Sequence, residues 1–128
     1  MHSRFIRYGL AWLFLSLASS AWADQKPYDK AQFDHDLAAG KPTIIYLHAT
    51  WCPTCRVQKP IVDKLSDDPQ LKQVTVFVAD FDKETALKKA LKVNQQSTFV
   101  VFRQGREVAR STGQTQESAI RETFDKAL

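Results

Sequence analysis

Three short apolar runs stand out in the middle of the chain. They are rich in β-branched and aromatic side chains that do not alternate with polar ones, and they comprise residues 43–47, 74–79 and 98–102. This pattern is typical of strands that are buried on both faces of a sheet covered by helices. A fourth strand is expected at about residues 107–111, because Gln104 and Gly105 stand where a tight hairpin turn would fall.

Apolar residues at helical spacing fill the intervals between these runs and predict four helices. The first ends at Gly40, and the second extends from about residue 52 to 65 with a kink at Pro60. The third is capped by Asp82, and the fourth begins near Thr115. The apolar positions that mark the helices are Phe33 and Leu37, Cys55 and Val62, Leu87 and Leu91, and Ile120 and Phe124.

The order of these elements predicts the topology of the sheet. The first two strands are joined through a helix, so they are expected to be parallel with a right-handed crossover. The last two strands are expected to form an antiparallel hairpin. The fold class is therefore α/β, with a central mixed four-stranded sheet and helices on both faces.

Residues 1–23 have the three-part pattern of a secretory signal peptide. A positively charged start and an apolar run of eleven residues at 8–18 precede a small-x-small cleavage site, Ala21-Trp22-Ala23. The apolar run is shorter than the ~20 residues that cross a membrane, which argues against an anchor. The chain is therefore predicted to comprise a signal peptide at 1–23 and one exported domain at 24–128.

Length, charge and cysteine count exclude several classes of protein. The chain has 128 residues, 44% hydrophobic and 25% charged, which fits one globular domain. The leader holds two of the 18 basic residues and none of the 14 acidic ones, so residues 24–128 carry a formal charge of only +2. We find no basic stripe that would bind nucleic acid. Two cysteines exclude a disulfide-dense scaffold and a four-cysteine zinc site.

Both cysteines lie in the segment Trp51-Cys52-Pro53-Thr54-Cys55, between the first apolar run and the second predicted helix. A helix start carries unpaired N–H groups and roughly half a positive charge. Thiols placed there have pKa values lowered to about 3.5–7.5. Cys52, at the exposed helix start, is expected to attack a disulfide, and Cys55, almost one turn later, to resolve the mixed disulfide. Pro53 suits the first turn because its missing N–H donor costs nothing there.

Two other interpretations of the cysteine pair remain open. An inert disulfide in a binding module is one, although so small a loop removes little entropy from the unfolded chain. A metal site that carries copper through Cys52, Cys55 and perhaps His48 is the other. His48 lies four residues before Cys52, and the two side chains need not face one site.

The segment from residue 43 to 56 (TIIYLHATWCPTCR) resembles the active-site strand and helix of the thioredoxin superfamily. The resemblance extends to residues 97–105, where the family's last hairpin begins, and it covers roughly all of 24–128. It implies a thioredoxin-like fold with Cys52 as the nucleophile and Cys55 as the resolving thiol. The positions that it implies for substrate binding are Trp51, Pro53, Thr54, Gln96 and Ser97.

Three positions depart from the family's pattern. Ser97 stands where the family usually has a cis-proline, and we expect a trans bond between Gln96 and Ser97 because a cis bond before a non-proline costs about 2.5–4 kcal/mol. Tyr46 stands where thioredoxins have a buried aspartate that assists the resolving cysteine. The usual first strand is expected to be absent, since residues 24–30 contain few apolar side chains.

These observations predict a periplasmic thiol–disulfide oxidoreductase that exchanges a Cys52–Cys55 disulfide or dithiol with protein substrates. A reductant is favoured, because the chain is a lone module without the inserted helical domain of dedicated oxidants. Such a reductant needs an electron donor, and a membrane thiol transporter is expected to supply it. No cofactor is expected, and a monomer is the default because no unpaired cysteine is left to bridge chains.

Overall fold

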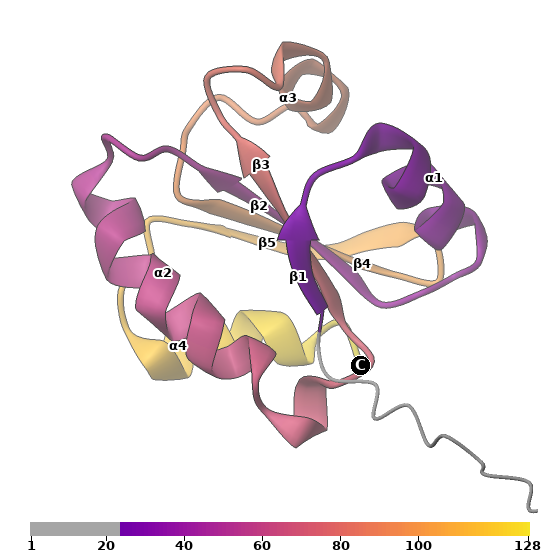
Figure 1. Ribbon diagram of the computed structural model, residues 1–128. Coiled ribbons are helices and arrows are strands. Elements are labelled where there is room, and N and C mark those ends of the chain that lie inside the picture. Colours follow the sequence, from indigo (N-terminus) through magenta and orange to yellow (C-terminus); the bar gives the residue numbers. More distant parts are fainter. Residues whose placement is uncertain (1–23) are drawn as a thin grey trace, which may run out of the picture.

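A five-stranded mixed sheet forms the centre of the computed structural model, which describes residues 24–128 (Figure 1). The strands lie in the order β1-β3-β2-β4-β5; β1 and β2 run parallel to β3, and β4 runs antiparallel to both β2 and β5. The elements are β1 (Asp24–Pro27), α1 (Lys30–Ala38), β2 (Thr43–His48), α2 (Pro53–Ser66), a 3-10 turn (Pro69–Leu71), β3 (Thr75–Asp80), α3 (Thr85–Leu91), β4 (Thr98–Arg103), β5 (Arg106–Thr112) and α4 (Glu117–Asp125). The predicted α/β class and the hairpin are confirmed. The predicted signal peptide at 1–23 lies outside the described residues.

The strand count of four was wrong, because β1 forms at the edge of the sheet beside β3. Its residues pair in register with residues 75–78, and Tyr28 N–H continues the pairing by donating to Val78 O at 2.9 Å. An edge strand of this kind is held by main-chain hydrogen bonds, and the side chains of β1 are exposed or half-buried. It therefore leaves no run of apolar residues in the sequence.

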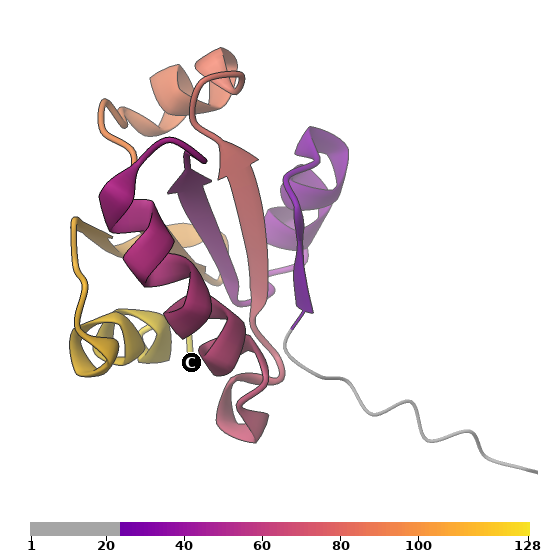
Figure 2. The same cartoon turned by 60° about the vertical axis from the view of Figure 1, so that its left-hand side comes forward.

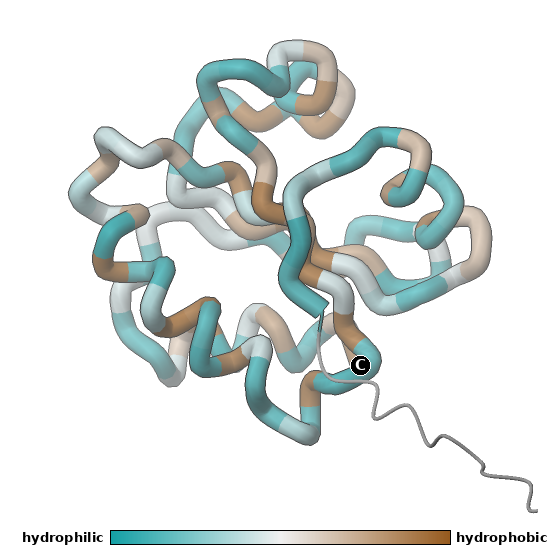
Figure 3. Tube along the Cα trace, in the orientation of Figure 1, coloured by the Kyte–Doolittle hydropathy of each residue, from teal (hydrophilic) through white to brown (hydrophobic). Residues whose placement is uncertain are grey.

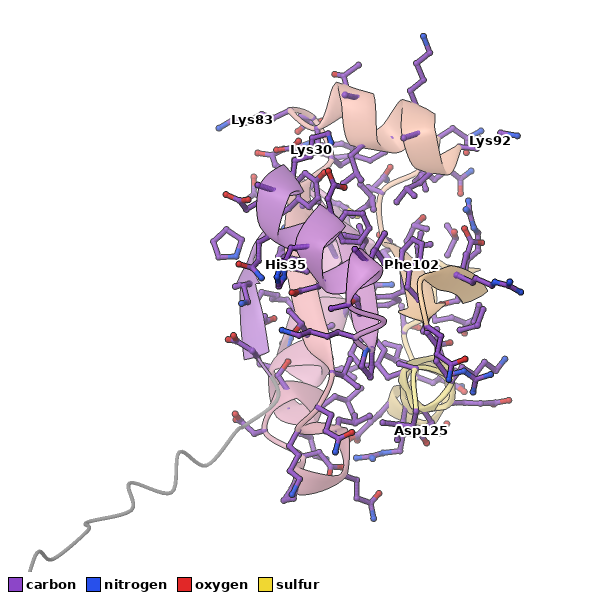
Figure 4. All side chains as sticks on the ribbon, turned by 90° about the vertical axis from the view of Figure 1, so that its right-hand side faces the viewer. Lys30, His35, Lys83, Lys92, Phe102 and Asp125 are labelled. Carbon is purple, nitrogen blue, oxygen red and sulfur yellow. The ribbon has the colours of Figure 1, made fainter. Side chains whose placement is uncertain are left out.

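Alternate side chains of the central strands enter two separate hydrophobic cores. Ile44 and Tyr46 of β2 point to the face covered by α2 and α4, whereas Ile45 and Leu47 point to the face covered by α1 and α3. Figure 2 shows the helices on either side of the sheet, and Figure 3 shows hydrophobic segments concentrated in the central strands. In Figure 4, Lys83 and Lys92 point outward beyond the two ends of α3. Among residues 24–128, no helix is both long and apolar enough to span a bilayer.

The residues that precede α2 and α3 determine how the segment around Cys52 is held. The helix after β2 begins at Pro53, with Cys52 as its N-cap residue. The predicted cap of α3 was wrong: Glu84 occupies the N-cap position, and Asp82 accepts a hydrogen bond from Trp51 Nε1 at 2.7 Å. Asp82 is unavailable as a cap because it belongs to the turn that Asp80 closes by accepting the N–H groups of residues 82 and 83.

Candidate active site

Cys52 lies at the point where the chain leaves β2 and enters α2. Its extended backbone (φ −85°, ψ 118°) lets its side chain turn back over the first helical turn, where Sγ accepts the N–H of Cys55 at 3.2 Å. A sulfur in this position occupies the place that a serine or aspartate oxygen takes in an ordinary N-cap. The positive pole of the helix therefore acts directly on the Cys52 sulfur.

Both cysteines are buried thiols. Cys52 is 1% exposed and Cys55 is fully enclosed, and they pack with Ala49 and Phe81. The expectation that Cys52 stands exposed at the helix start was therefore wrong. The helix start itself is at the surface, since Trp51 and Pro53 on either side are exposed, but the side chain of Cys52 points inward toward the loop that precedes β4.

Ser97, in the loop before β4, lies against both sulfurs. Its Oγ is 3.1 Å from Sγ of Cys52 and 3.1 Å from Sγ of Cys55. Within residues 24–128 no peptide bond is cis, so the expected trans bond before Ser97 is confirmed. Ser97 instead has a left-handed backbone, with φ of +61°. This conformation brings its hydroxyl over the dithiol.

The left-handed conformation of Ser97 is held by its own main-chain groups. Its N–H donates to Leu47 O at 2.8 Å, and its carbonyl accepts Gly113 N–H at 3.0 Å and Gln58 Nε2 at 3.2 Å. Gln58 also donates to Gln114 O at 2.9 Å, so its amide ties α2 to both loops beside the site. Because both main-chain polar groups of Ser97 are satisfied within the fold, its hydroxyl is the group left to take part in chemistry.

Gln58 is a site residue that the sequence analysis missed. It is fully buried in α2 and lies on the same helix face as Cys55 and Val62, three residues after the first and four before the second. A polar amide within an otherwise apolar helical stripe needs a buried partner. The place of Gln58 on the apolar face of the predicted helix was the signal in the sequence that could have identified it as a site residue.

The surroundings shift the pKa values of the two thiols in opposite directions. Burial opposes ionisation of Cys52, but hydrogen bonds from the Cys55 thiol, the Ser97 hydroxyl and the Cys55 N–H outweigh it and lower the pKa of Cys52 to about 7. Burial, reinforced by the neighbouring Cys52 sulfur, raises the pKa of Cys55. Cys52 is therefore the first of the two thiols to ionise, near neutral pH, and the proton of the singly ionised pair stays on Cys55.

The model that describes the thioredoxin family matches residues 24–126. The chain belongs to the thioredoxin family. A thioredoxin-like protein of Synechocystis is 31% identical over 91 residues, which are 70% of this chain and 86% of that protein. Thioredoxin-1 of Saccharomyces cerevisiae is 29% identical over 83 residues, 65% of this chain and 79% of the yeast protein. The crystal structure of Trxlp from Edwardsiella tarda has a TM-score of 0.77 at 35% identity and covers 79% of this chain and 98% of its own.

Membership of the thioredoxin family assigns the class of reaction, because thioredoxins are thiol–disulfide oxidoreductases. The predicted superfamily, fold and enzyme class are thereby confirmed. In this thioredoxin-family chain the Cys52–Cys55 pair lies at the start of α2, after the short connection from β2.

Tyr46 replaces the family's buried carboxylate with a group that stays protonated. The ring stacks on Phe99 with centroids 4.6 Å apart, and the hydroxyl donates to the Cys55 carbonyl at 3.4 Å. Burial, together with the nearby cysteines, raises the pKa of Tyr46 far above its usual value. Tyr46 therefore supports the helix start but cannot accept a proton from Cys55.

His48 is separate from the cysteine pair. Its ring packs edge-on against Tyr46 at 5.4 Å and lines a small surface pocket with Thr50, Asp80 and Asp82. Burial, with a contribution from Lys59, lowers the pKa of His48. In the part of the chain that the structure describes, no three His, Cys, Asp or Glu side chains are close enough together to hold a metal ion.

The surface around the dithiol is formed by the other residues singled out from the sequence. Trp51 is 53% exposed, Pro53 is exposed, and Thr54 and Gln96 are half-buried. Val57, 50% exposed on the next turn of α2, adds an apolar side chain that the sequence analysis did not select. Trp51 is held by its hydrogen bond to Asp82. A hydrogen bond from the Gln96 side chain also helps to lower the pKa of Cys52 against the effect of burial, with a smaller effect than the donors already named.

Proposed function

We propose that the protein catalyses disulfide exchange on protein substrates in the periplasm, with Cys52 as the nucleophile and Cys55 as the resolving thiol. The Cys52 thiolate attacks a substrate disulfide, which forms a mixed disulfide and releases one substrate thiolate. Cys55 then attacks Cys52 Sγ, which closes the Cys52–Cys55 bond and releases the second substrate sulfur. The observation that carries this assignment is the opposite shift of the two pKa values.

The direction that we propose is reduction of the substrate. A nucleophile with a pKa of about 7 corresponds to the reducing members of the superfamily, whereas strongly oxidising ones have values near 3.5. A less acidic Cys52 means that the dithiol form is stabilised less, which favours giving up electrons. The electron donor is proposed to be a membrane thiol transporter, and the protein is proposed to act as a monomer.

Substrate segments are proposed to dock on the surface formed by Trp51, Pro53, Thr54, Val57 and Gln96. Trp51 and Val57 supply exposed apolar area beside the buried sulfur. Because Cys52 is 1% exposed, side chains over its sulfur must shift when a substrate sulfur enters. Relatively extended or unfolded disulfide-bonded segments fit such a site best.

Export rests on the leader pattern of residues 1–23. Expression of the full chain in a Gram-negative host, followed by fractionation and intact-mass measurement, tests it. Recovery from the periplasm with a mass corresponding to 24–128 supports export. Retention of residues 1–23 in the cytoplasmic fraction contradicts it.

A redox titration against glutathione buffers tests both the activity and its direction. We expect a single two-electron transition at the reducing end of the superfamily range, which spans about −270 to −120 mV. A Cys52–Cys55 bond that resists reduction at every accessible poise would end the catalytic proposal. A potential at the oxidising end would reverse the proposed direction.

The variants Cys52→Ser and Cys55→Ser form a matched pair for the assignment of roles. With a small disulfide-bonded protein as substrate, Cys55→Ser is expected to accumulate a mixed disulfide through Cys52, detected by mass spectrometry under non-reducing conditions. Cys52→Ser is expected to accumulate none, because Cys55 is fully enclosed and stays protonated. The reverse pattern would exchange the two roles.

A further inference from the structure

The buried hydroxyl of Ser97 connects the two sulfurs of the dithiol. Its Oγ lies 3.1 Å from Cys52 Sγ and 3.1 Å from Cys55 Sγ, and the residue is 3% exposed. A hydroxyl can donate one hydrogen bond and accept others at the same time. In the mixed disulfide Cys52 carries no charge to attract the Cys55 proton, so the arrangement becomes a chain in which Cys55 S–H donates to Ser97 Oγ and Ser97 O–H points to Cys52 Sγ.

The resolving step needs a route for the proton of Cys55, and the side chains around it offer few. Of the two ionisable side chains of β2 on this face, Tyr46 is protonated and directs its hydroxyl to the Cys55 carbonyl, and His48 packs against the ring of Tyr46. Apart from Cys52, Ser97 is the side chain among the described residues that hydrogen-bonds to the Cys55 sulfur. Bulk water has little access, since Cys52, Cys55 and Ser97 are all buried.

We propose that Ser97 is a catalytic residue that relays a proton from Cys55 to the departing substrate sulfur. This inference rests on the proposed function. As Cys55 Sγ attacks Cys52 Sγ in the mixed disulfide, the Cys55 proton passes to Ser97 Oγ, and the hydroxyl proton of Ser97 passes to the departing sulfur. The Cys52–substrate S–S bond breaks and the Cys52–Cys55 S–S bond forms. One S–H bond is lost at Cys55 and one is gained by the substrate, so atoms, electrons and protons balance.

The relay requires that Ser97 Oγ stays where it is while the sulfurs exchange bonds. The hydrogen bonds of its N–H to Leu47 O and of its carbonyl to Gly113 N–H and Gln58 Nε2 fix the left-handed backbone from three sides. Gln58 is therefore a positioning residue for the relay. In-line attack places the departing sulfur on the side of Cys52 Sγ opposite to Cys55, so the second transfer runs from Ser97 Oγ past Cys52 Sγ, with which Ser97 is in hydrogen-bond contact.

The test isolates the resolving step. Cys52 is first joined to glutathione in acid with a pyridyl disulfide of glutathione, and closure of the Cys52–Cys55 bond is then followed after a jump to neutral pH by the release of glutathione. Ser97→Ala and Ser97→Gly both remove the hydroxyl, but alanine keeps the Cβ atom whereas glycine favours the left-handed backbone. An effect common to both variants therefore belongs to the hydroxyl. The control is Ser111→Ala, a serine on β5 whose hydroxyl accepts a hydrogen bond from Thr123.

General acid–base catalysis typically contributes about 10²- to 10⁴-fold to a rate, so we expect closure at neutral pH to slow by at least about tenfold in both Ser97 variants. The difference is expected to shrink as the pH rises past the pKa of Cys55, because the thiolate then attacks without a relay. Wild-type rates in both variants would overturn the relay, and so would a slowing that is the same at every pH. If the wild-type protein itself does not close the bond, the proposed function fails instead.

Discussion

Cys52 shows how a nearly enclosed thiol can still be acidic. Desolvation alone raises a thiol pKa, because the low dielectric disfavours the charged form. Three donors converge on this sulfur, one from the main chain of Cys55 and two from the side chains of Cys55 and Ser97, and together they outweigh the cost of burial. The acidity of Cys52 thus depends on the loop at Ser97 as well as on the helix start.

The acidity of Cys52 predicts a pH profile for its reactivity. The rate of alkylation by iodoacetamide should rise with pH to a midpoint near 7, because the thiolate is the nucleophile. Mass spectrometry of the timed reaction locates the label on Cys52. A midpoint near the ordinary thiol value of about 8.5 would contradict the hydrogen-bond argument.

Tyr46 is expected to matter through its ring far more than through its hydroxyl. Tyr46→Phe removes a long hydrogen bond and should lower the free energy of unfolding by about 0.5–1 kcal/mol. Tyr46→Ala opens a cavity beside Phe99 and should cost about 3–5 kcal/mol. Urea denaturation of both variants separates these contributions. Equal losses in the two variants would show that the hydroxyl, and not the stacked ring, carries the stability.

At the scale of elements, the β4–β5 hairpin is the connection whose geometry follows most directly from its sequence. Gln104 and Gly105 both have positive φ, at 52° and 78°, which is the conformation of the two-residue turn that suits the twist of the strands. Glycine adopts it freely, whereas glutamine does so at a cost. A Cβ atom at position 105 would also lie 3.2 Å from Leu37 O.

Two substitutions in this turn should therefore have opposite effects. Gly105→Ala should lower the free energy of unfolding by about 1–2 kcal/mol, because it adds backbone strain and a close contact with the end of α1. Gln104→Asn should raise it by about 0.5 kcal/mol, because asparagine tolerates the left-handed region. Thermal unfolding followed by circular dichroism measures both. Stabilisation by Gly105→Ala would show that the turn relaxes to another conformation.

The elements that sequence patterns predicted well are those whose side chains are buried. The three central strands appear in the sequence as continuous apolar runs because both of their faces are buried, and α1, α2 and α4 bury apolar side chains at helical spacing. The edge strand β1 forms through main-chain pairing with β3, which no side-chain pattern reports. The motif around Cys52 indicated a helix start at Pro53, and it indicated a reactive dithiol because a helix start stabilises a thiolate. The inward turn of the Cys52 side chain and the approach of Ser97 depend on contacts across 45 residues, which local patterns do not contain.

At the scale of the whole molecule, the dithiol couples folding to pH. The pKa of Cys52 is lower in the folded protein than in the unfolded chain, so its contribution to stability is fully present above the unfolded value and is lost as pH falls through about 7. The pKa of Cys55 is raised, so its contribution has the opposite sign: it is present below the unfolded value and is lost as pH rises beyond it.

The free energy of unfolding of the reduced protein should therefore rise between about pH 7 and the unfolded thiol pKa of about 8.5, and fall at higher pH. Denaturant titrations at a series of pH values, performed on the reduced protein and on Cys52→Ser, measure this. The variant should lack the rise. A rise of the same size in both proteins would assign the pH dependence to groups other than Cys52.

The left-handed backbone at Ser97 also limits the routes by which this chain could have diverged from its relatives. Proline fixes φ near −65° and has no N–H, whereas Ser97 has φ of +61° and uses its N–H to bind Leu47 O. Ser97→Pro would therefore break this loop rather than restore the cis-proline loop that is usual in the family. Exchange between the two versions of the site therefore requires changes in the surrounding loop as well as at position 97.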